Sequence, residues 1–369
     1  SSWKMVQFIN PLLSILTLFL FYFILLEIGL SDKLKLIYLS FLVALPRDIF
    51  ASSMILNDYL IVFTATAALL FYFRCLRSVE REDLNTSFFN FIILSLFTGL
   101  GTVSKQHGLL LLVLPSTVVF IYLFKERKFA LTRLMPILLF ISTIAFLEEL
   151  YKYNESGRFL VSNYDHFTNA HNQFPGSIDK VEFFSFRLWG LLQEPFMTEN
   201  TSASVPSELF ARTFFDYEWR FLSPRTNPAI WVGRLAYIVG IIWMLFFLGT
   251  LIQWIKTKPI NRSSISLISF AYVVPVFLGL LYVAVPFLQT IRYPHFSCMK
   301  AMFMLPGLVT LLTMHALLAH NLKSLGRYSY LLVALNLIYT TILLIAIYYI
   351  LEVEISLDNL RGPLWNYPS

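Results

Sequence analysis

Charge is scarce in this chain. Only 14% of its 369 residues are Asp, Glu, Lys or Arg, whereas 57% are hydrophobic. An average soluble domain carries about a quarter charged residues, so the composition excludes an ordinary soluble domain. Apolar stretches long enough to cross a bilayer recur along the whole length, which is typical of a polytopic membrane protein. The net charge of +6 is therefore not read as a nucleic-acid footprint, and we expect no nucleic acid among the partners.

Cysteines and nucleotide-binding motifs are also scarce. The two cysteines, Cys75 and Cys298, have no metal-ligand spacing and form no disulfide framework. No G-x-x-x-x-G-K-[ST] or G-x-G-x-x-G sequence occurs, so no nucleotide loop is predicted. No regular series of charges lies inside the apolar stretches, which argues against a proton relay. The chain opens without an initiator Met or a signal peptide, and we expect further residues upstream of Ser1.

A series of apolar segments dominates what is present. A spanning helix needs about 20 mostly apolar residues. The predicted fold is an all-α polytopic membrane protein with about ten transmembrane helices and one large external insert. Residues 1–150 hold the N-terminal helices, 151–228 the insert, and 229–369 the C-terminal helices. The candidate spans lie near 8–30, 34–47, 56–74, 88–104, 107–124, 132–150, 229–255, 264–288, 297–319 and 327–351.

The loops between these segments predict the orientation. One alternating set, "SDKLK", "RCLRSVERED", "KERKFALTR", "KTKPINR" and "NLKSLGR", contains 14 Lys and Arg residues, whereas the short segments on the other side contain six. Basic loops stay in the cytoplasm, so the first set is predicted to lie inside. Both chain ends and the insert then lie outside, and an external N-terminus suggests another helix upstream.

Polar residues gather at the predicted external ends of the spans. Each has an ordinary explanation: a helix cap for Asn57 or Asp58, a snorkelling side chain for Lys105, a turn residue for His107, and headgroup anchors for the later cations. Their convergence on one side also suits a lipid-phosphate substrate, because cations hold phosphate by charge-assisted hydrogen bonds and a carboxylate accepts a proton. The candidate site residues are Asp48, Asn57, Asp58, Lys105, His107, Arg292 and Lys300.

The insert contains the segment "DKVEFFSFRLWGLLQEPF", residues 179–196, with apolar residues at helical spacing. This pattern predicts one amphipathic helix at the membrane surface, which serves either as a cap over the bundle or as a lid over a cavity. The nearby "DHFTNAH" has Asp165, His166 and His171, but the spacing is not that of a zinc site. No metal-ligating residues are therefore assigned.

Three segments carry a resemblance to a known family. "ASSMILNDYLIVFTATAALLFYFRCLR", "FTGLGTVSKQHGLLLLVLPSTVVFIYLF" and "CMKAMFMLPGLVTLL" resemble, in order and on one predicted side, segments of the GT-C superfamily of membrane glycosyltransferases. The similarity is to the family-39-like group, which includes protein O-mannosyltransferases and the aminoarabinose transferase. "TFFDYEW", residues 213–219, is loosely similar to a further segment of some members.

The resemblance implies transfer of a sugar from a polyprenyl-phosphate donor to an acceptor glycan, lipid or protein, with inversion at the anomeric carbon. Asp58 matches the family's acidic residue at a helix mouth and Lys105 the lysine of its "[ST]-K" segment, while Arg292 and Lys300 fall near its late basic residues. No cofactor is required, with a divalent metal ion as an alternative. The expected location is a bacterial inner membrane, with the endoplasmic reticulum membrane as the alternative.

The chain also departs from the family pattern. The family's principal catalytic acid lies in the first external loop, which would precede Ser1, and Met302 and Phe303 replace the usual Arg-Tyr. Two other functions stay open: a transporter or flippase of an anionic lipid-linked substrate, which would use similar external cations, and a non-catalytic subunit of a membrane complex. No internal repeat of the kind common in transporters is evident.

Overall fold

The structure, a computed structural model, describes residues 8–45, 58–157, 180–198, 201, 203–215, 227–257, 271–292, 304–320 and 334–341. These residues form helices and no strand, which confirms the predicted all-α class. A final helical stretch covers 334–341. The elements before it are α2 (Ile9–Glu27), α3 (Asp32–Ala44), α5 (Asp58–Glu80), α6 (Leu84–Ser104), η1 (Gln106–Leu112), α7 (Val113–Lys125), α8 (Arg127–Phe129), η2 (Ala130–Leu134), α9 (Met135–Ser156), α11 (Lys180–Phe184), α12 (Leu188–Gln193), α14 (Val205–Phe214), α15 (Asn227–Thr257), α17 (Val274–Arg292) and α18 (Leu305–His320).

Six of the described helices are long and apolar enough to cross a membrane, and two shorter apolar helices, within α17 and α18, accompany them. The count of about ten spans is therefore not reached among the described residues. The segment 34–47 forms only the 13-residue helix α3, which is too short for a full crossing because a helix rises 1.5 Å per residue. The segment 107–124 begins with the tighter 3₁₀ turns of η1 before it becomes α7.

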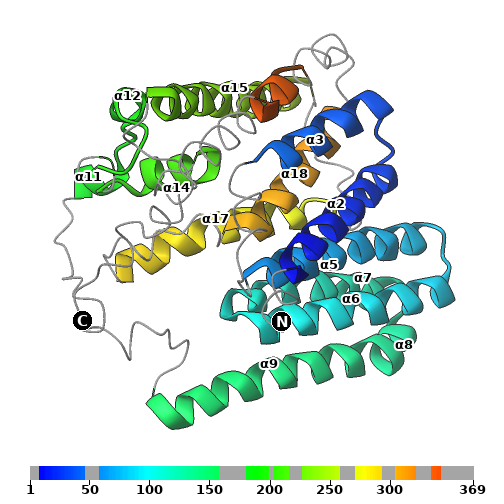
Figure 1. Cartoon of the computed structure of the whole chain (residues 1–369). Coiled ribbons are helices and arrows are strands. Elements are labelled where there is room, and N and C mark those ends of the chain that lie inside the picture. Colours follow the sequence, from blue (N-terminus) through cyan, green and yellow to red (C-terminus); the bar gives the residue numbers. More distant parts are fainter. Residues whose placement is uncertain are drawn as a thin grey trace.

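Helix α5 lies at the centre of the bundle. It is the most enclosed of the six long helices, with 78% of its apolar window buried, and it packs against α2, α6, α7 and α18. Ala65 and Ala68 are fully enclosed on it, and such small residues let neighbouring backbones approach closely. Figure 1 shows α5, α6 and α7 running side by side, with α2 and α18 next to them.

The two ends of the bundle differ in character. At one end, on the right of Figure 1, Glu27 at the end of α2 binds Arg77 of α5 at 2.8 Å and Arg74 at 3.3 Å. Lys125 Nζ donates to the carbonyl of Val79 at 3.3 Å beside the same loops. We call this the basic end. The other end carries α11, α12 and α14 and is called the insert end.

The short connection between α5 and α6 lies at the basic end. Asp83 begins α6 as its cap, because its carboxylate accepts a hydrogen bond from the backbone N–H of Thr86 at 3.0 Å. The contacts of Asp83 with Thr86 hold the pKa of the Asp83 carboxyl below its usual value. Glu82 before it has a φ of 58°, so the loop turns sharply.

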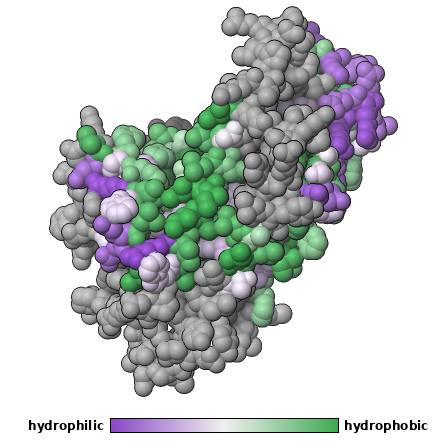
Figure 2. Space-filling view, turned by 90° about the horizontal axis from the view of Figure 1, so that it is seen from above, coloured by the Kyte–Doolittle hydropathy of each residue, from purple (hydrophilic) through white to green (hydrophobic). Residues whose placement is uncertain are grey.

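The surface is consistent with a bundle that lies across a membrane. Many large apolar side chains of α2, α9 and α15 are exposed, including Phe19, Phe140 and Leu245. Figure 2 shows hydrophobic surface across the middle of the face in view, with hydrophilic residues gathered toward both sides of it. An apolar band between two polar ends is what a bilayer requires of a spanning protein.

Candidate functional site

The predicted site residues fall into three groups. Lys105 and His107 are fully described and lie in the connection between α6 and η1. Asp58 is the first residue of α5 and Arg292 the last residue of α17, and only their backbone is described. The predictions for Asp48, Asn57 and Lys300 lie outside the described residues.

The connection that carries Lys105 is a tight turn. Lys105 has an extended backbone, with φ of −157° and ψ of 144°, and its N–H donates to Gly101 O at 3.4 Å. Its own carbonyl accepts from the N–H of Gly108 at 2.8 Å. A Cβ added to Gly108 would lie 2.0 Å from the carbonyl oxygen of Gly101. Only glycine permits such an approach. The backbones of α6 and η1 are therefore in direct contact at these two glycines, next to Lys105.

The beginning of α5 meets this turn. A Cβ at Gly108 would lie 2.9 Å from Cδ1 of Ile61, and one at Gly101 would lie 3.2 Å from Oγ1 of Thr64. Ile61 follows Asp58 by three residues, so the Asp58 backbone lies only about 4.5 Å further along the helix axis. The structure thus places the start of α5 and the Lys105 turn at the same end of the bundle.

Helix α17 reaches the turn from another side. The rings of His107 and Tyr282 meet edge to face, with centroids 6.0 Å apart and planes at 87°. Tyr282 is fully buried there. Arg292 follows ten residues later, which carries its backbone about 15 Å further along the helix. The described residues therefore bring Lys105, His107 and the start of α5 together, but they do not place Arg292 beside them.

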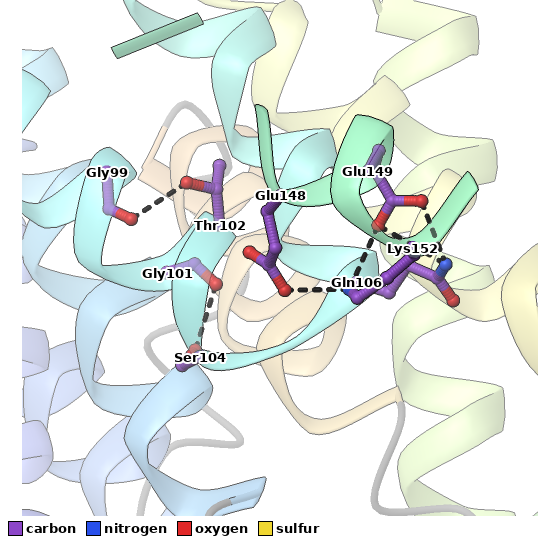
Figure 3. A network of polar contacts seen from close by, with 8 residues as sticks. All are labelled: Gly99, Gly101, Thr102, Ser104, Gln106, Glu148, Glu149 and Lys152. Carbon is purple, nitrogen blue, oxygen red and sulfur yellow. Dashed lines mark hydrogen bonds and ion pairs between the residues drawn. The ribbon is translucent and has the colours of Figure 1, made fainter. Parts of the chain in front are cut away.

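A polar network that the predictions did not include lies against this turn (Figure 3). The side-chain amide of Gln106 donates to both carboxylate oxygens of Glu149 on α9, at 3.4 and 3.3 Å. Lys152 bridges Glu149 at 3.1 Å and Glu148 at 2.7 Å. The only sign of this network in the sequence is the string "LEELYK" at the end of an apolar run, where i,i+3 and i,i+4 spacing lets the lysine meet both acids.

The insert contributes a second buried polar group, which the predictions also did not include. In α14 the guanidinium of Arg212 donates to the carboxylate of Glu208, and their side chains are 3% and 0% exposed. Phe210 and Phe214 of the same helix pack against Gly240 of α15. The carbonyl of Phe214 accepts a hydrogen bond from Tyr339. Helix α14 is therefore part of the bundle core and does not lie over it.

The amphipathic helix predicted for 179–196 is interrupted. Two short helices, α11 and α12, replace it, separated by residues 185–187. In the break, the backbone N–H of Arg187 donates to Ser207 Oγ at 2.7 Å, and the Ser185 carbonyl accepts from the hydroxyl of Ser204. These bonds to the start of α14 replace helical hydrogen bonds. The predicted apolar stripe is divided as a result, with Leu191 buried and Val181 exposed.

The described side chains of the site are a lysine ammonium group, a histidine ring and two carboxylates, all at one end of the bundle. Lys105 and the His107 ring are suited to binding an anion, while Glu148 and Glu149 are already engaged by Lys152 and Gln106. Within the described ranges, no three His, Cys, Asp or Glu side chains lie close enough together to hold a metal ion.

In the part of the chain that the structure describes, the fold is all-α with six candidate membrane-spanning helices, which is the architecture of a multi-pass membrane protein. No protein family model matches the chain, no curated protein matches it, and no solved structure matches it. The resemblance to the GT-C superfamily therefore rests on the sequence motifs alone and stays a prediction.

Proposed function

We propose that this chain is a GT-C-like integral-membrane glycosyltransferase. It moves a sugar from a polyprenyl-phosphate donor to an acceptor on the external or luminal face, with inversion at the anomeric carbon. One observation carries the proposal: the start of α5, where Asp58 lies, meets the Lys105 turn through Ile61 and the two glycines. The start of α5 at Asp58 and the turn at Lys105, 47 positions apart in the sequence, thereby lie at one end of the bundle, which is also the insert end.

The donor phosphate is assigned to the cations of the turn. Lys105 and His107 bind the lipid phosphate and stabilise the negative charge that grows on it as the sugar departs. Arg292 and Lys300 belong to the same proposal as outer contacts of the phosphate. The polyprenyl tail lies against the exposed apolar helices. A hydrocarbon chain is as favourable in contact with apolar side chains as it is among lipid tails.

The acceptor is assigned to the acidic side of the site. Its hydroxyl oxygen attacks the anomeric carbon, the bond from that carbon to the phosphate oxygen breaks, and the hydroxyl proton passes to a carboxylate. The principal acid is expected upstream of Ser1, while Asp58, with Asn57 and Asp48 near it in sequence, orients the acceptor. No step is assigned to a metal ion. A bacterial inner membrane is the proposed location, with the endoplasmic reticulum as the alternative.

The test compares Asp58→Asn and Lys105→Ala in the full-length protein, with purified undecaprenyl-phosphate and dolichyl-phosphate sugars as donors. Both variants are expected to lose most sugar transfer, Asp58→Asn at saturating donor and Lys105→Ala mainly through a raised KM for the donor. Asp32→Asn is the matched control, because Asp32 is the first residue of α3 as Asp58 is of α5. Lys128→Ala, at an exposed lysine of α8, is the control for charge.

Wild-type turnover in both site variants would remove the assigned roles. Movement of the labelled lipid across the bilayer without any transferred sugar would instead support the transporter or flippase. Wild-type protein that neither transfers nor moves any lipid-linked sugar would favour the non-catalytic subunit.

A further inference from the structure

The outer surface of α11 and α12 exposes large apolar side chains. Val181 and Phe184 of α11 are 78% and 60% exposed, and Trp189 of α12 is 72% exposed. Such side chains, gathered on two successive short helices, are unusual on a surface that faces only water. Whether water or lipid covers these side chains depends on how the two short helices are placed along the membrane-spanning helices.

Helix α15 fixes the depth of α12. Arg234 donates to the carbonyls of Leu192 and Gln193, at 2.8 and 3.0 Å. Tyr237 donates to the carbonyl of Pro195 at 2.5 Å. Arg234 and Tyr237 lie seven and ten residues after Asn227, where α15 begins, so their backbones are about 10 and 15 Å along this helix. The C-terminal end of α12 therefore lies beside the first turns of a span and not above them.

Helix α17 fixes the depth of α11 independently. Phe183 of α11 is buried in a small apolar cluster with Val205 and Leu209 of α14, against which Phe287 of α17 packs. Phe287 lies five residues before Arg292, the last residue of α17, and so within the last two turns of that helix. Helix α11 is therefore level with the outer end of α17, at the same boundary that α15 gives for α12.

The boundary region also has the chemistry of a lipid interface. Arg234 lies over the ring of Trp231, 4.9 Å from its centroid, and Trp231 is itself exposed. Exposed tryptophans and arginines at this depth are typical of the aromatic belt where headgroups meet hydrocarbon. Each short helix has a buried apolar residue, Phe183 or Leu191, and exposed ones, which are Val181 and Phe184 on α11 and Trp189 on α12.

We propose that the exposed apolar residues of α11 and α12 insert into the outer leaflet of the membrane and anchor the insert to the lipid surface. The occupant of this surface is lipid, because the surface lies level with the ends of two spans and continues the exposed apolar surface of α15. The inference does not depend on the proposed enzymatic activity. It gives the insert two attachments, the bundle through Phe183 and Leu191, and the bilayer through Phe184 and Trp189.

The experiment places a nitroxide label at residues 181, 184 and 189, one at a time, in full-length protein with Cys75→Ala and Cys298→Ser, reconstituted into phospholipid nanodiscs. Collision rates with oxygen, which partitions into lipid, and with a water-soluble nickel chelate are measured by EPR. Labels at 182 and 128 are the controls, since Glu182 is an exposed polar residue of α11 and Lys128 is an exposed residue of α8 at the basic end. The oxygen-to-nickel ratio is expected to be several-fold higher at 181, 184 and 189 than at the controls.

Nickel collision at 184 and 189 equal to that at the controls would overturn the proposal, because the side chains would then lie in water. Low collision with both reagents would overturn it too, since protein would cover the surface. A second measurement needs no label: tryptophan emission in nanodiscs of lipid brominated near the headgroup. Trp189→Phe is expected to lower the quenched fraction, whereas Trp243→Phe, at a fully buried tryptophan, is expected to raise it. A quenched fraction that Trp189→Phe leaves unchanged would contradict lipid contact.

Discussion

Gln106 and Glu149 are 43 residues apart in the chain, yet the amide of Gln106 donates to both carboxylate oxygens of Glu149. Through this contact α9 holds the residue that lies between Lys105 and His107. The Lys105 turn is thus fixed from two sides, by the glycine contact of α6 with η1 and by a carboxylate of α9.

Loss of the Glu149 carboxylate is expected to loosen the turn. Glu149→Ala leaves the Gln106 amide without this acceptor, and hydrogen bonds to charged groups contribute about 1.5–3 kcal/mol. Hydrogen exchange followed by mass spectrometry is expected to speed up at residues 104–109. Glu148→Ala is the matched control, because Glu148 binds Lys152 at 2.7 Å. Equal exchange in the two variants would show that Glu149 does not hold the turn.

The same contact predicts coupling between its partners. In a double-mutant cycle, Gln106→Ala and Glu149→Ala together are expected to destabilise the protein less than the sum of the two single changes. The difference is expected to be about 1 kcal/mol, as for other directly bonded pairs. Unfolding in mixed micelles with increasing SDS measures it, and strict additivity would contradict the contact.

Gly108→Ala is expected to be among the most damaging small substitutions. The new Cβ would lie 2.0 Å from Gly101 O, so the backbone must move apart, at a cost of about 1–3 kcal/mol or more. Gly249→Ala is the matched control, since a Cβ there meets nothing within 4 Å and alanine is the better helix former by about 1 kcal/mol. A Gly108→Ala protein as stable as wild type would show that the two backbones do not touch.

The buried ion pair of α14 predicts opposite results for one and two substitutions. Arg212→Met leaves the Glu208 carboxylate buried without its guanidinium, which is expected to cost about 3–5 kcal/mol. Glu208→Leu combined with Arg212→Met removes both charges and is expected to be nearly neutral in stability. Unfolding midpoints measure both. A double variant as unstable as the single one would mean that the pair is required by further polar partners.

The cap of α6 predicts a pH dependence outside the membrane. The contacts with Thr86 hold the pKa of the Asp83 carboxyl below its usual value, so the stabilising effect of the cap is present above about pH 4 and is lost as the pH falls through the lowered pKa. Asp83→Ala is therefore expected to lower the unfolding midpoint at pH 7. At a pH below the lowered pKa of Asp83, the midpoints of the variant and the wild type are expected to be equal. Asp83→Asn keeps a capping oxygen without titrating, and an unchanged pH dependence in that variant would contradict the assignment.

The sequence was sufficient for the coarse features. The all-α class followed from hydropathy, and the alternation of the apolar segments predicts that Asp58 and Lys105 share one end, where Ile61 of α5 does meet the Lys105 turn. The number of full spans did not follow: six of the described helices are long and apolar enough to cross, and α3 has only 13 residues. Hydropathy measures the composition of a segment, and a short apolar helix that packs inside a bundle has the same composition as one that crosses it.

The polar contacts of the site were beyond the reach of local patterns. Glu149 meets Gln106 only because α9 packs beside η1, and no periodicity encodes which helices become neighbours. Helix α14 falls within the predicted insert, 151–228, and no local pattern showed that its Glu208 and Arg212 would be buried as a pair. The interruption at 185–187 was missed for a similar reason, since Ser204 and Ser207, about twenty residues away, take the place of helical partners.

The glycine pair has a mechanical consequence. With no side chain between their backbones, Gly101 and Gly108 join the ends of α6 and η1 into one closely packed hairpin. If a substrate binds at Lys105 as proposed, it is expected to enter by displacement of the whole hairpin or of the segments opposite it, and a cross-link between α6 and α7 is expected to leave entry unchanged.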